Sequence, residues 1–434
     1  MPLLALALVG DTATAIEHVP VAAELWKRTR CGSPSSPGID LITKWGKADI
    51  SPTSVAAAFG YPRPLMVRGA SSWQSLNGLW EFEAFTPRPG LRPPFGATLN
   101  ETILVPFPVE SCLSGVRNHT AAGLAAHDDV PPTYTHVWYK TTILASADAT
   151  TTRTLLHFGA VDWQTMVYIN GVWVGSHEGG YDSFSFDITH ALQRGSNEVF
   201  VAVLDPSNKG SQPFGKQRTS AMYSPSGDTY SPVTGIWQSV WVESVPARHI
   251  TRLRIFADTK KLHLNVETSV PDAATINVTV TSNGRVLLRA AGQANLPFSV
   301  AMPAAEIKLW SPERPSLFNM SVSYGTDAVQ SYFGMREVTL CRDASGVNRP
   351  CINGEYRFLS GVLDQSYWPD GQYTAPGDAA LLFDLQAMQQ LGLNMVRLHQ
   401  KTNPARYYYH ADRLGVVIQQ DMVRGLGVCV RAGR

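Results

Sequence analysis

The sequence predicts a mainly β, multi-domain protein. Two β-sandwiches, the first jelly-roll-like and the second immunoglobulin-like, precede the first three β/α units of a TIM (β/α)8 barrel. Three observations support this fold class. Short strands dominate up to about residue 339, helical periodicity is nearly absent from residues 76–246, and strands alternate with helices after Leu340. A chain of 434 residues is long enough for two to four domains with separate cores.

Residues 1–42 are compatible with a signal peptide followed by a leader or linker. The apolar run from Leu3 to Val9 and the small residues at 13–15 favour a signal peptide, although a positively charged start is absent. Residues 16–42 contain CGSPSSPG and lack periodicity, as is typical of a linker. Secretion is favoured over a cytoplasmic location, and four Asn-x-Ser/Thr sequons agree with it: Asn100, Asn118, Asn277 and Asn319.

Residues 43–247 are predicted to form the first sandwich. Runs such as TRTLLHFG (152–159), NEVFVAVLD (197–205) and GIWQSVWVES (235–244) are rich in β-branched and aromatic residues with partial alternation. Asn170-Gly171 lies between two such runs, and both residues accept the positive φ that a two-residue hairpin turn requires.

Residues 248–339 are predicted to form the second sandwich. Runs such as ITRLRIFAD (250–258), LHLNVETSV (262–270) and TINVTVTS (275–282) recur at the spacing of an immunoglobulin-like domain.

Residues 340–434 are predicted to hold an incomplete barrel. The strand EYRFLSGVL (355–363), an amphipathic helix within 375–392, the strand NMVRLH (394–399), the helix PARYYYHADRLG (404–415) and the strand VVIQQD (416–421) follow one another. Strand-helix-strand units at this spacing indicate a parallel sheet. A TIM barrel needs eight such strands, so three strands make less than half of one.

Composition excludes several classes of function. The chain has 36 basic and 35 acidic residues, which gives no electrostatic reason to expect nucleic acid as a partner. No apolar run approaches the 18 or so residues of a membrane span. The sequence also lacks a P-loop, a CxxC pair and a Gly-x-Ser-x-Gly motif, so we expect no cofactor and no metal. It leaves a homo-oligomer open, and among five cysteines Cys341 and Cys351 can form a disulfide or remain free thiols.

Several ordered motifs resemble glycoside hydrolase family 2, the β-galactosidase, β-glucuronidase and β-mannosidase group. They are VDWQTMVYINGVWVGSHEGGYDSFSFDIT (161–189), GKQ (215–217), TGIWQSVWVE (234–243), LWSPERPSL (309–317), YFGMRE (332–337) and GVLDQSYWPDGQYTAP (361–376). The resemblance extends from about Thr43 to Met422. It implies a sugar-binding (galactose-binding-like) first sandwich and a catalytic barrel.

The resemblance also implies retaining hydrolysis of a β-glycoside or oligosaccharide substrate by an exo-acting enzyme. One glutamic acid protonates the leaving oxygen while a second glutamate attacks the anomeric carbon. In the family these residues follow the fourth and seventh barrel strands, and no glutamate follows Glu355 here. Asn197-Glu198 matches the family's Asn-Glu dipeptide only in its letters. No catalytic residue is therefore assigned, and we expect the 434-residue chain to be incomplete and inactive alone.

Five residues are candidates for substrate binding. Asp364 and Asp421 are expected at the C-terminal ends of the first and third barrel strands, where TIM-barrel active sites form, and Arg397 and His399 end the second. The resemblance implies that His399 hydrogen-bonds sugar hydroxyls and that Arg397 steadies the nucleophile's carboxylate. Trp368 offers an apolar ring for a pyranose face. The alternative is a structural ion pair between Asp364 and Arg397.

Two functions remain in competition. The first is an exo-β-glycosidase of family 2, and the second is a non-catalytic carbohydrate-binding or scaffold protein made of the two sandwiches. The chain also departs from the family inside the matched region, with Gln419 in place of a tryptophan and Asn403 in place of a glutamate.

Overall fold

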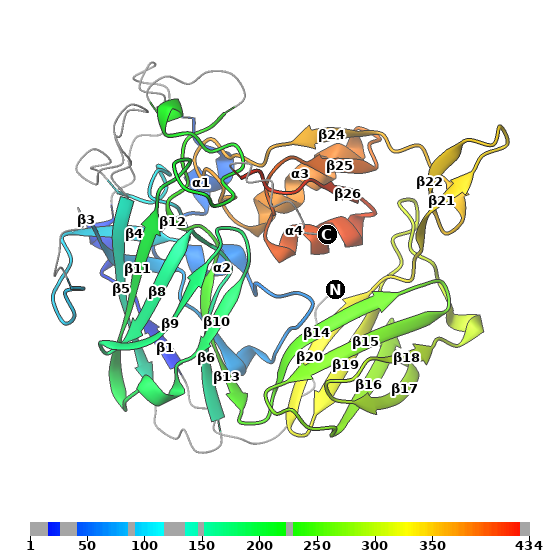
Figure 1. The fold of residues 1–434 in the computed structure, drawn as a ribbon, viewed down its shortest axis with the longest axis horizontal. Helices are drawn as coiled ribbons and strands as arrows, with labels where there is room; N and C mark the ends of the chain where they lie inside the picture. The colour runs from blue at the N-terminus through cyan, green and yellow to red at the C-terminus, as the bar shows by residue number, and fades with distance from the viewer. Residues whose placement is uncertain are drawn as a thin grey trace, which may run out of the picture.

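The computed structural model describes residues 16–26, 41–85, 92–116, 135–145, 152–222 and 229–425. Figure 1 shows the first sandwich on the left, the second at the lower right, and the part with parallel strands above them. The predicted signal peptide, the sequon at Asn118, and Cys31 and Cys429 lie outside the described residues.

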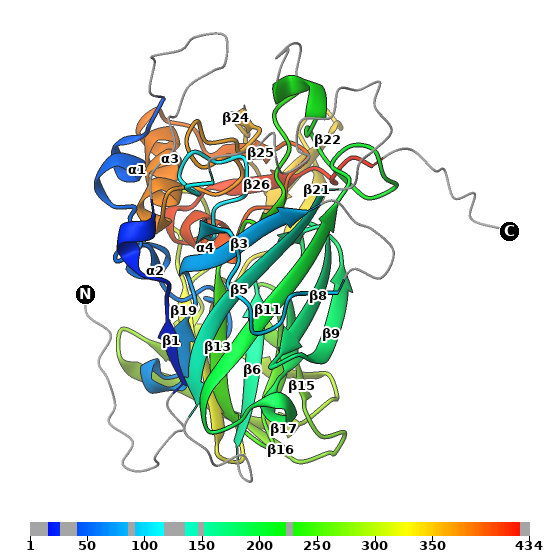
Figure 2. The same cartoon turned by 90° about the vertical axis from the view of Figure 1, so that its left-hand side faces the viewer.

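The first sandwich packs a seven-stranded antiparallel sheet against a four-stranded one, and Figure 2 shows its long strands. The larger sheet has the order β4-β3-β5-β11-β8-β9, with β1 paired to β5. Its strands are β1 (Ile16–Val19), β3 (Gly78–Phe85), β4 (Glu101–Val105), β5 (Thr135–Ala145), β8 (Gln164–Ile169), β9 (Val172–Glu178) and β11 (Gly195–Asp205). The smaller sheet comprises β10 (Phe184–Asp187), β6 (Thr152–Phe158), β13 (Val240–Pro246) and β2 (Trp73–Ser75).

Alternating residues of β11 explain its central place. Val199, Val201 and Val203 face the core between the sheets, whereas Phe200 belongs to a second apolar cluster on the outer face. The predicted hairpin is confirmed, because Asn170 (φ 51°) and Gly171 (φ 78°) connect β8 to β9.

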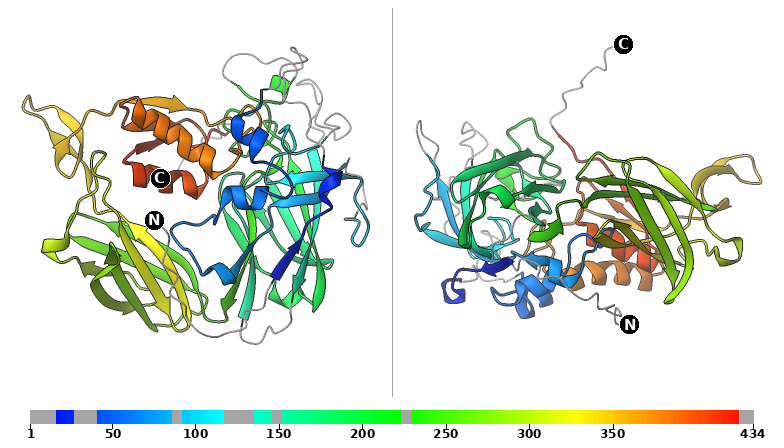
Figure 3. Two further views of the ribbon diagram at one scale, coloured as in Figure 1. Left: turned by 180° about the vertical axis from the view of Figure 1, so that it is seen from behind. Right: turned by 90° about the horizontal axis from the view of Figure 1, so that it is seen from below.

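The N-terminal segment differs from the expected linker. Ile16–Val19 form β1, which pairs antiparallel with β5 from Ile16 opposite Ala145 to Val19 opposite Thr142. Short helices α1 (Lys44–Ala48) and α2 (Val55–Phe59) follow. In Figure 3 they are blue and lie beside the orange helix α3 (Asp378–Gln390). A four-residue strand is too short for sequence periodicity to reveal, and its partner lies more than 120 residues away.

The second sandwich is immunoglobulin-like. One sheet has the order β14-β15-β18 and the other β17-β16-β19-β20. The strands are β14 (Ile250–Ala257), β15 (Lys261–Thr268), β16 (Thr275–Ser282), β17 (Arg285–Gln293), β18 (Phe298–Ala301), β19 (Phe318–Tyr324) and β20 (Asp327–Phe333). Alternate residues of β16, namely Ile276, Val278 and Val280, are buried in its core.

A small sheet connects the second sandwich to the last part of the chain. It comprises β21 (Val338–Arg342), β22 (Asn348–Ile352) and β23 (Glu355–Tyr356), and it projects to the right in Figure 1. Cys341 and Cys351 form a disulfide across the β21–β22 hairpin, with their Cα atoms 5.9 Å apart. Of the two alternatives for these cysteines, the structure therefore has the disulfide.

The last part has the order β24 (Gly361–Asp364), α3 (Asp378–Gln390), β25 (Met395–Leu398), α4 (Ala405–Leu414) and β26 (Val417–Gln420). The strands pair in parallel in the order β24-β25-β26. The helix predicted within 375–392 is confirmed, and Gly392 (φ 77°) follows it as the C′ glycine. Leu381 and Leu385 of α3 pack on Val396 and Leu398 of β25 in one core.

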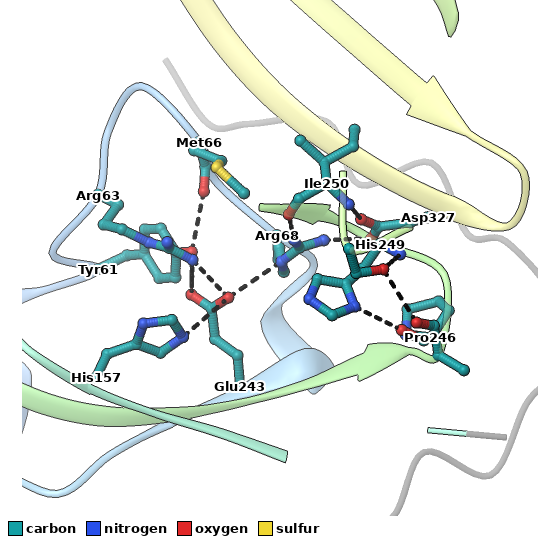
Figure 4. Close-up of polar contacts among 12 residues, drawn as sticks. Tyr61, Arg63, Met66, Arg68, His157, Glu243, Pro246, His249, Ile250 and Asp327 are labelled. Atoms are coloured by element: carbon teal, nitrogen blue, oxygen red, sulfur yellow. Dashed lines mark hydrogen bonds and ion pairs between the residues drawn. The ribbon is translucent and has the colours of Figure 1, made fainter. Parts of the chain in front are cut away.

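A buried cluster of charges joins the two sandwiches (Figure 4). Glu243 of β13 is 0% exposed and accepts hydrogen bonds from Tyr61 (2.6 Å), Arg63 (2.6 and 2.7 Å) and Arg68 Nε (3.0 Å). Arg68 also pairs with Asp327 of the second sandwich. One arginine side chain therefore connects both sandwiches to residues 61–68.

Candidate functional site

The three parallel strands bring most of the predicted site residues to one edge. Asp364 ends β24, His399 follows β25 and Asp421 follows β26. The His399 N–H donates to the Asp364 carbonyl at 2.8 Å, and the Asp421 N–H donates to the Leu398 carbonyl at 3.0 Å. Because the carboxyl ends of parallel strands meet at the same edge, these residues form a row, which we call the strand-end row.

Arg397 belongs to the same row, and it forms an ion pair with Asp421. Arg397 Nε lies 3.1 Å from both carboxylate oxygens of Asp421, and its terminal nitrogen lies 2.9 Å from Oδ2. The hydrogen bond to Asp421 and its negative charge raise the pKa of Arg397. The Arg397 side chain is 47% exposed and that of Asp421 19%, so the pair borders solvent.

Asp364 has other partners, so the structural pair of Asp364 with Arg397 is not formed. The Asp364 carboxylate accepts a hydrogen bond from the Ser366 N–H (2.6 Å) and one from the Tyr407 hydroxyl (3.3 Å). The nearby Asp364 charge contributes, after burial, to raising the pKa of Tyr407 above its ordinary value.

The His399 ring has hydrogen-bonding capacity left over. Its Nε2 lies 3.9 Å from Asp421 Oδ2, which is too long for a hydrogen bond. Its buried Nδ1 has no hydrogen-bond partner among the described residues. Nε2 can therefore serve a ligand or a water molecule, whereas the buried Nδ1 has no surface open to a ligand.

Trp368 is not brought into this group. Its ring packs edge-to-face on Trp45 of α1, with the centroids 6.1 Å apart at 87°. The backbone of Trp368 pairs with Gln372 in both directions, at 2.7 and 3.0 Å. In the described parts of the chain, we find no hydrogen bond or ring contact between Trp368 and the strand-end row. The indole is used for packing on the N-terminal segment.

Lys401 is a residue of the site that sequence reasoning missed. It is 1% exposed, and its Nζ donates to the carbonyls of Ser366 and Tyr373, both at 2.7 Å. The ammonium also lies 4.8 Å from the Tyr373 ring centre and 5.4 Å from that of Trp237. Burial lowers the pKa of Lys401 to about 7, against the opposing effect of Asp364. Its only sequence signal is its place two residues after His399.

Loops of the first sandwich support the loops that follow the parallel strands. The N–H groups of Phe214 and Gly215 donate to the Arg424 carbonyl at 2.7 and 2.9 Å. A Cβ on Gly215 (φ 60°) would lie 2.6 Å from the Gln400 carbonyl oxygen, so only glycine allows this approach. The Tyr181 hydroxyl also lies 3.1 Å from that of Tyr373. The loops at Tyr181 and at Phe214–Gly215 therefore help to hold the loops after β24, β25 and β26 in place.

A separate cavity of 290 Å³ lies between the first sandwich and the helices α3 and α4. None of the four residues of the strand-end row (Asp364, Arg397, His399 and Asp421) lines it.

The described residues contain no group of three or more His, Cys, Asp or Glu side chains that could hold a metal ion. No helix in the described ranges is long and apolar enough to cross a membrane.

The Asn197-Glu198 dipeptide has a structural role. Asn197 is 0% exposed, accepts a hydrogen bond from Asn170 of the β8–β9 turn and exchanges hydrogen bonds with Gln193. The ring of His177, in the segment HEGGYDSF (177–184), stacks on Phe184 with 4.1 Å between centroids. These contacts give both segments a role in the packing of the first sandwich.

Comparisons with known proteins add family information. Residues 73–246 match the family model described as glycosyl hydrolases family 2, sugar binding domain, and residues 247–336 match glycosyl hydrolases family 2. A putative β-glucuronidase of Formosa agariphila is 26% identical over 298 residues, 66% of this chain and 27% of that protein. A β-galactosidase of Thermoanaerobacter pseudethanolicus is 25% identical over 313 residues, 66% of this chain and 39% of that protein.

Solved structures share the fold. The β-glucuronidase of Faecalibacterium prausnitzii superposes with a TM-score of 0.66 and 21% identity, covering 82% of this chain and 61% of that chain. The β-glucuronidase of Ruminococcus gnavus gives a TM-score of 0.67 and 19% identity, covering 84% of this chain and 59% of that chain. The matches thus span between 27% and 39% of the two curated relatives, and about three fifths of these two structures.

Proposed function

This chain belongs to glycoside hydrolase family 2, and from that membership we propose that it is part of a retaining exo-β-glycosidase acting on O-glycosyl bonds. The names of its relatives, putative β-glucuronidase and β-galactosidase, support a β-glycoside substrate. The observation that carries the proposal is the strand-end row of Asp364, Arg397, His399 and Asp421. It lies where a TIM barrel places its active site, provided that β24, α3, β25, α4 and β26 are the first units of one.

In this proposal the strand-end row forms one wall of the sugar site. Arg397 holds the Asp421 carboxylate in place, and its oxygens accept hydrogen bonds from sugar hydroxyls. His399 supplies a ring nitrogen that can donate or accept. Asp364 contributes as an acceptor that is already ordered by Tyr407. We leave Trp368 out of this wall because its ring is packed on Trp45.

The same wall cannot perform retaining hydrolysis unaided. That reaction needs two carboxyl groups about 5–5.5 Å apart, one protonated and one ionised. The β/α part offers six aspartates and no glutamate after Glu355. Asp378 is engaged by Arg406 and His410, and Asp412 by Arg336 and Tyr332. We therefore propose that residues 1–434 alone bind a β-glycoside weakly and do not hydrolyse it.

The test is an assay of the purified 434-residue chain with nitrophenyl β-galactoside, β-glucuronide, β-mannoside and β-glucoside. We expect no release of nitrophenol above background, while the product of a longer transcript, carrying two further glutamates after codon 422, should release it. In that longer protein Asp421→Asn and His399→Ala should lower kcat/KM. Turnover by the 434-residue chain that disappears with Asp421→Asn would instead make an aspartate pair the catalyst.

A non-catalytic carbohydrate-binding protein is the second candidate, favoured by the same lack of glutamate after Glu355. A transcript that stops at codon 434 in cells, together with sugar binding by the purified chain, would support it over the glycosidase.

A further inference from the structure

The cavity between the first sandwich and α3/α4 has the lining of a ligand site. Six aromatic side chains surround its 290 Å³: Phe59, Tyr181, Trp237, Trp241, Tyr373 and Tyr408. The indole N–H of Trp237 donates to the Gly180 carbonyl at 2.8 Å, and that of Trp241 donates to Glu243 at 3.0 Å. The two rings are therefore fixed in the wall of the cavity, where His157 stacks on Trp241 and the Lys401 ammonium lies over Trp237. The half-buried rings of Phe59, Tyr181 and Tyr408 offer apolar surface to the C–H groups of a ligand.

The charged groups of the lining are already neutralised. Arg63 is bound to Glu243 at 2.6 Å, and Arg406 holds both carboxylate oxygens of Asp378. A charged ligand would have to displace one of these partners. In a half-buried site, the free energy lost with that ion pair exceeds the free energy gained from the ligand's charge. A neutral ligand avoids this cost.

Several neutral polar groups of the lining have no partner within the described chain. The side chains of Gln238, Ser183 and Thr402 make no hydrogen bond there, and Asn403, which is 5% exposed, uses only its Nδ2. The buried Nε of Arg63 is also unpartnered. A cavity with aromatic walls and unused amide and hydroxyl groups suits a ligand with both C–H faces and hydroxyl groups.

We propose that this cavity is a second sugar site, which binds a neutral pyranoside of monosaccharide size. It is distinct from the strand-end row, because no residue of that row lines it. The site is built from both sides of one interface, with Gln238 on the first sandwich and Asn403 in the loop before α4. Ser183 and Ala405 are the exposed residues of the lining, so the cavity borders solvent at these positions. The inference does not depend on the proposed catalytic function.

The test measures binding of methyl β-glucopyranoside, methyl β-galactopyranoside and methyl β-glucuronide to the full chain by titration calorimetry and tryptophan fluorescence. We expect at least one neutral glycoside to bind saturably and to change the fluorescence, because Trp237 and Trp241 line the cavity. The charged glucuronide should bind no more tightly than the neutral glycosides. An absence of saturable binding, or clear preference for the glucuronide, would overturn the proposal.

Variants locate the binding. Gln238→Ala should weaken binding about tenfold, the effect of one lost hydrogen bond of about 1.4 kcal/mol. Ala405→Trp should block the cavity and abolish the saturable fluorescence change, and since Ala405 is exposed this variant should still fold, as circular dichroism would verify. Gln386→Ala on the exposed face of α3 is the matched control. The double variant His399→Ala/Asp421→Asn removes only the weak glycoside binding proposed for the strand-end row, so the saturable fluorescence change of the cavity should persist with the same midpoint. Loss of binding in the double variant but not in Ala405→Trp would assign the sugar to the strand-end row instead.

Discussion

At the scale of single residues, Glu243 is the side chain on which the arrangement of the sandwiches depends most. Burial opposes its charge, but the contacts with His157, Arg63 and Arg68 hold the pKa of Glu243 far below its ordinary value. Burial also lowers the pKa of His157 to about 4. This cluster could not be predicted from the sequence, because Arg68 and Glu243 are 175 residues apart. Only the fold brings them together.

We predict that Glu243→Gln destabilises the chain by about 3–5 kcal/mol, because it removes the counter-charge of Arg63 and one of the two carboxylates that pair with the buried Arg68. Urea unfolding followed by tryptophan fluorescence measures this. Glu267→Gln is the control: Glu267 pairs with Arg254 at 2.7 Å on the surface, and such exposed pairs contribute about 0–1 kcal/mol. Equal effects of the two variants would contradict the prediction.

Asp162 makes stability depend on pH. It is 2% exposed, and burial raises its pKa to about 7, against the hydrogen bond from Gln217 and with the added charge of Glu110. Its folded pKa lies above the ordinary value, so the folded state binds a proton that the unfolded state releases near pH 4. The stability that this group contributes is complete below about pH 4 and is lost as pH rises through 7.

We therefore predict that Asp162→Asn flattens the fall in unfolding free energy between pH 4 and 7, a fall of roughly 4 kcal/mol for a pKa moved from 3.8 to about 7. Thermal or urea unfolding at several pH values tests this. Asp182→Asn, at a side chain that is 67% exposed, should leave the slope as it is. An unchanged slope in Asp162→Asn would show that other groups cause it.

At the scale of elements, the parts with strong local signals could be predicted. The Asn170-Gly171 turn and the helix within 375–392 were both found from local patterns, since positive φ and 3.6-residue periodicity are visible in a short window. Short strands such as β1 and the pair β7 (Val161–Asp162) with β12 (Gly235–Ile236) were not. Two to four residues carry too little periodicity, and their partners lie 70 to 130 residues away.

The β21–β22 hairpin depends on its disulfide. Cys351 is 0% exposed and Cys341 lies ten residues earlier on the paired strand. We predict that replacing both cysteines by alanine lowers the local stability of Val338–Ile352 by about 2–3 kcal/mol. The reason is that a disulfide across a loop of this length lowers the conformational entropy of the unfolded chain by about that amount. Faster amide exchange in the hairpin would report the loss. Thr339→Ala, in the same strand with the disulfide intact, should change exchange much less.

At the scale of the whole molecule, the β/α part is fixed to both sandwiches. Asp412 of α4 accepts a hydrogen bond from Tyr332 (3.1 Å) and pairs with Arg336 (2.9 Å), and its carbonyl accepts the Trp310 indole N–H at 2.7 Å. On the other side, Lys401 lies over the Trp237 ring. The sequence placed Asp364, Arg397, His399 and Asp421 correctly at strand ends. It could not show Lys401 or the loop at Gly215 as neighbours, because those contacts cross between domains.

We predict that Asp412→Ala weakens the attachment of α4 to the second sandwich by about 1–3 kcal/mol, since it leaves the buried Tyr332 hydroxyl and the half-buried Arg336 without their acceptor. Amide exchange of Ala405–Leu414 should accelerate while that of β16 stays the same. Arg413→Ala, at the next and exposed position of the helix, is the control. Unchanged exchange in α4 would mean that the apolar core alone holds it.

The position of Arg68 also has a consequence for the order of events while the chain is being made. Its two acidic partners, Glu243 and Asp327, are synthesised 175 and 259 residues after it. At 5–20 residues per second, roughly 13 to 50 seconds pass before the second partner exists. During that interval the guanidinium has only water and transient neighbours, so residues 61–68 can take their final place only after the second sandwich has left the ribosome. Residues 61–68, although translated early, are thus among the last to reach their native contacts.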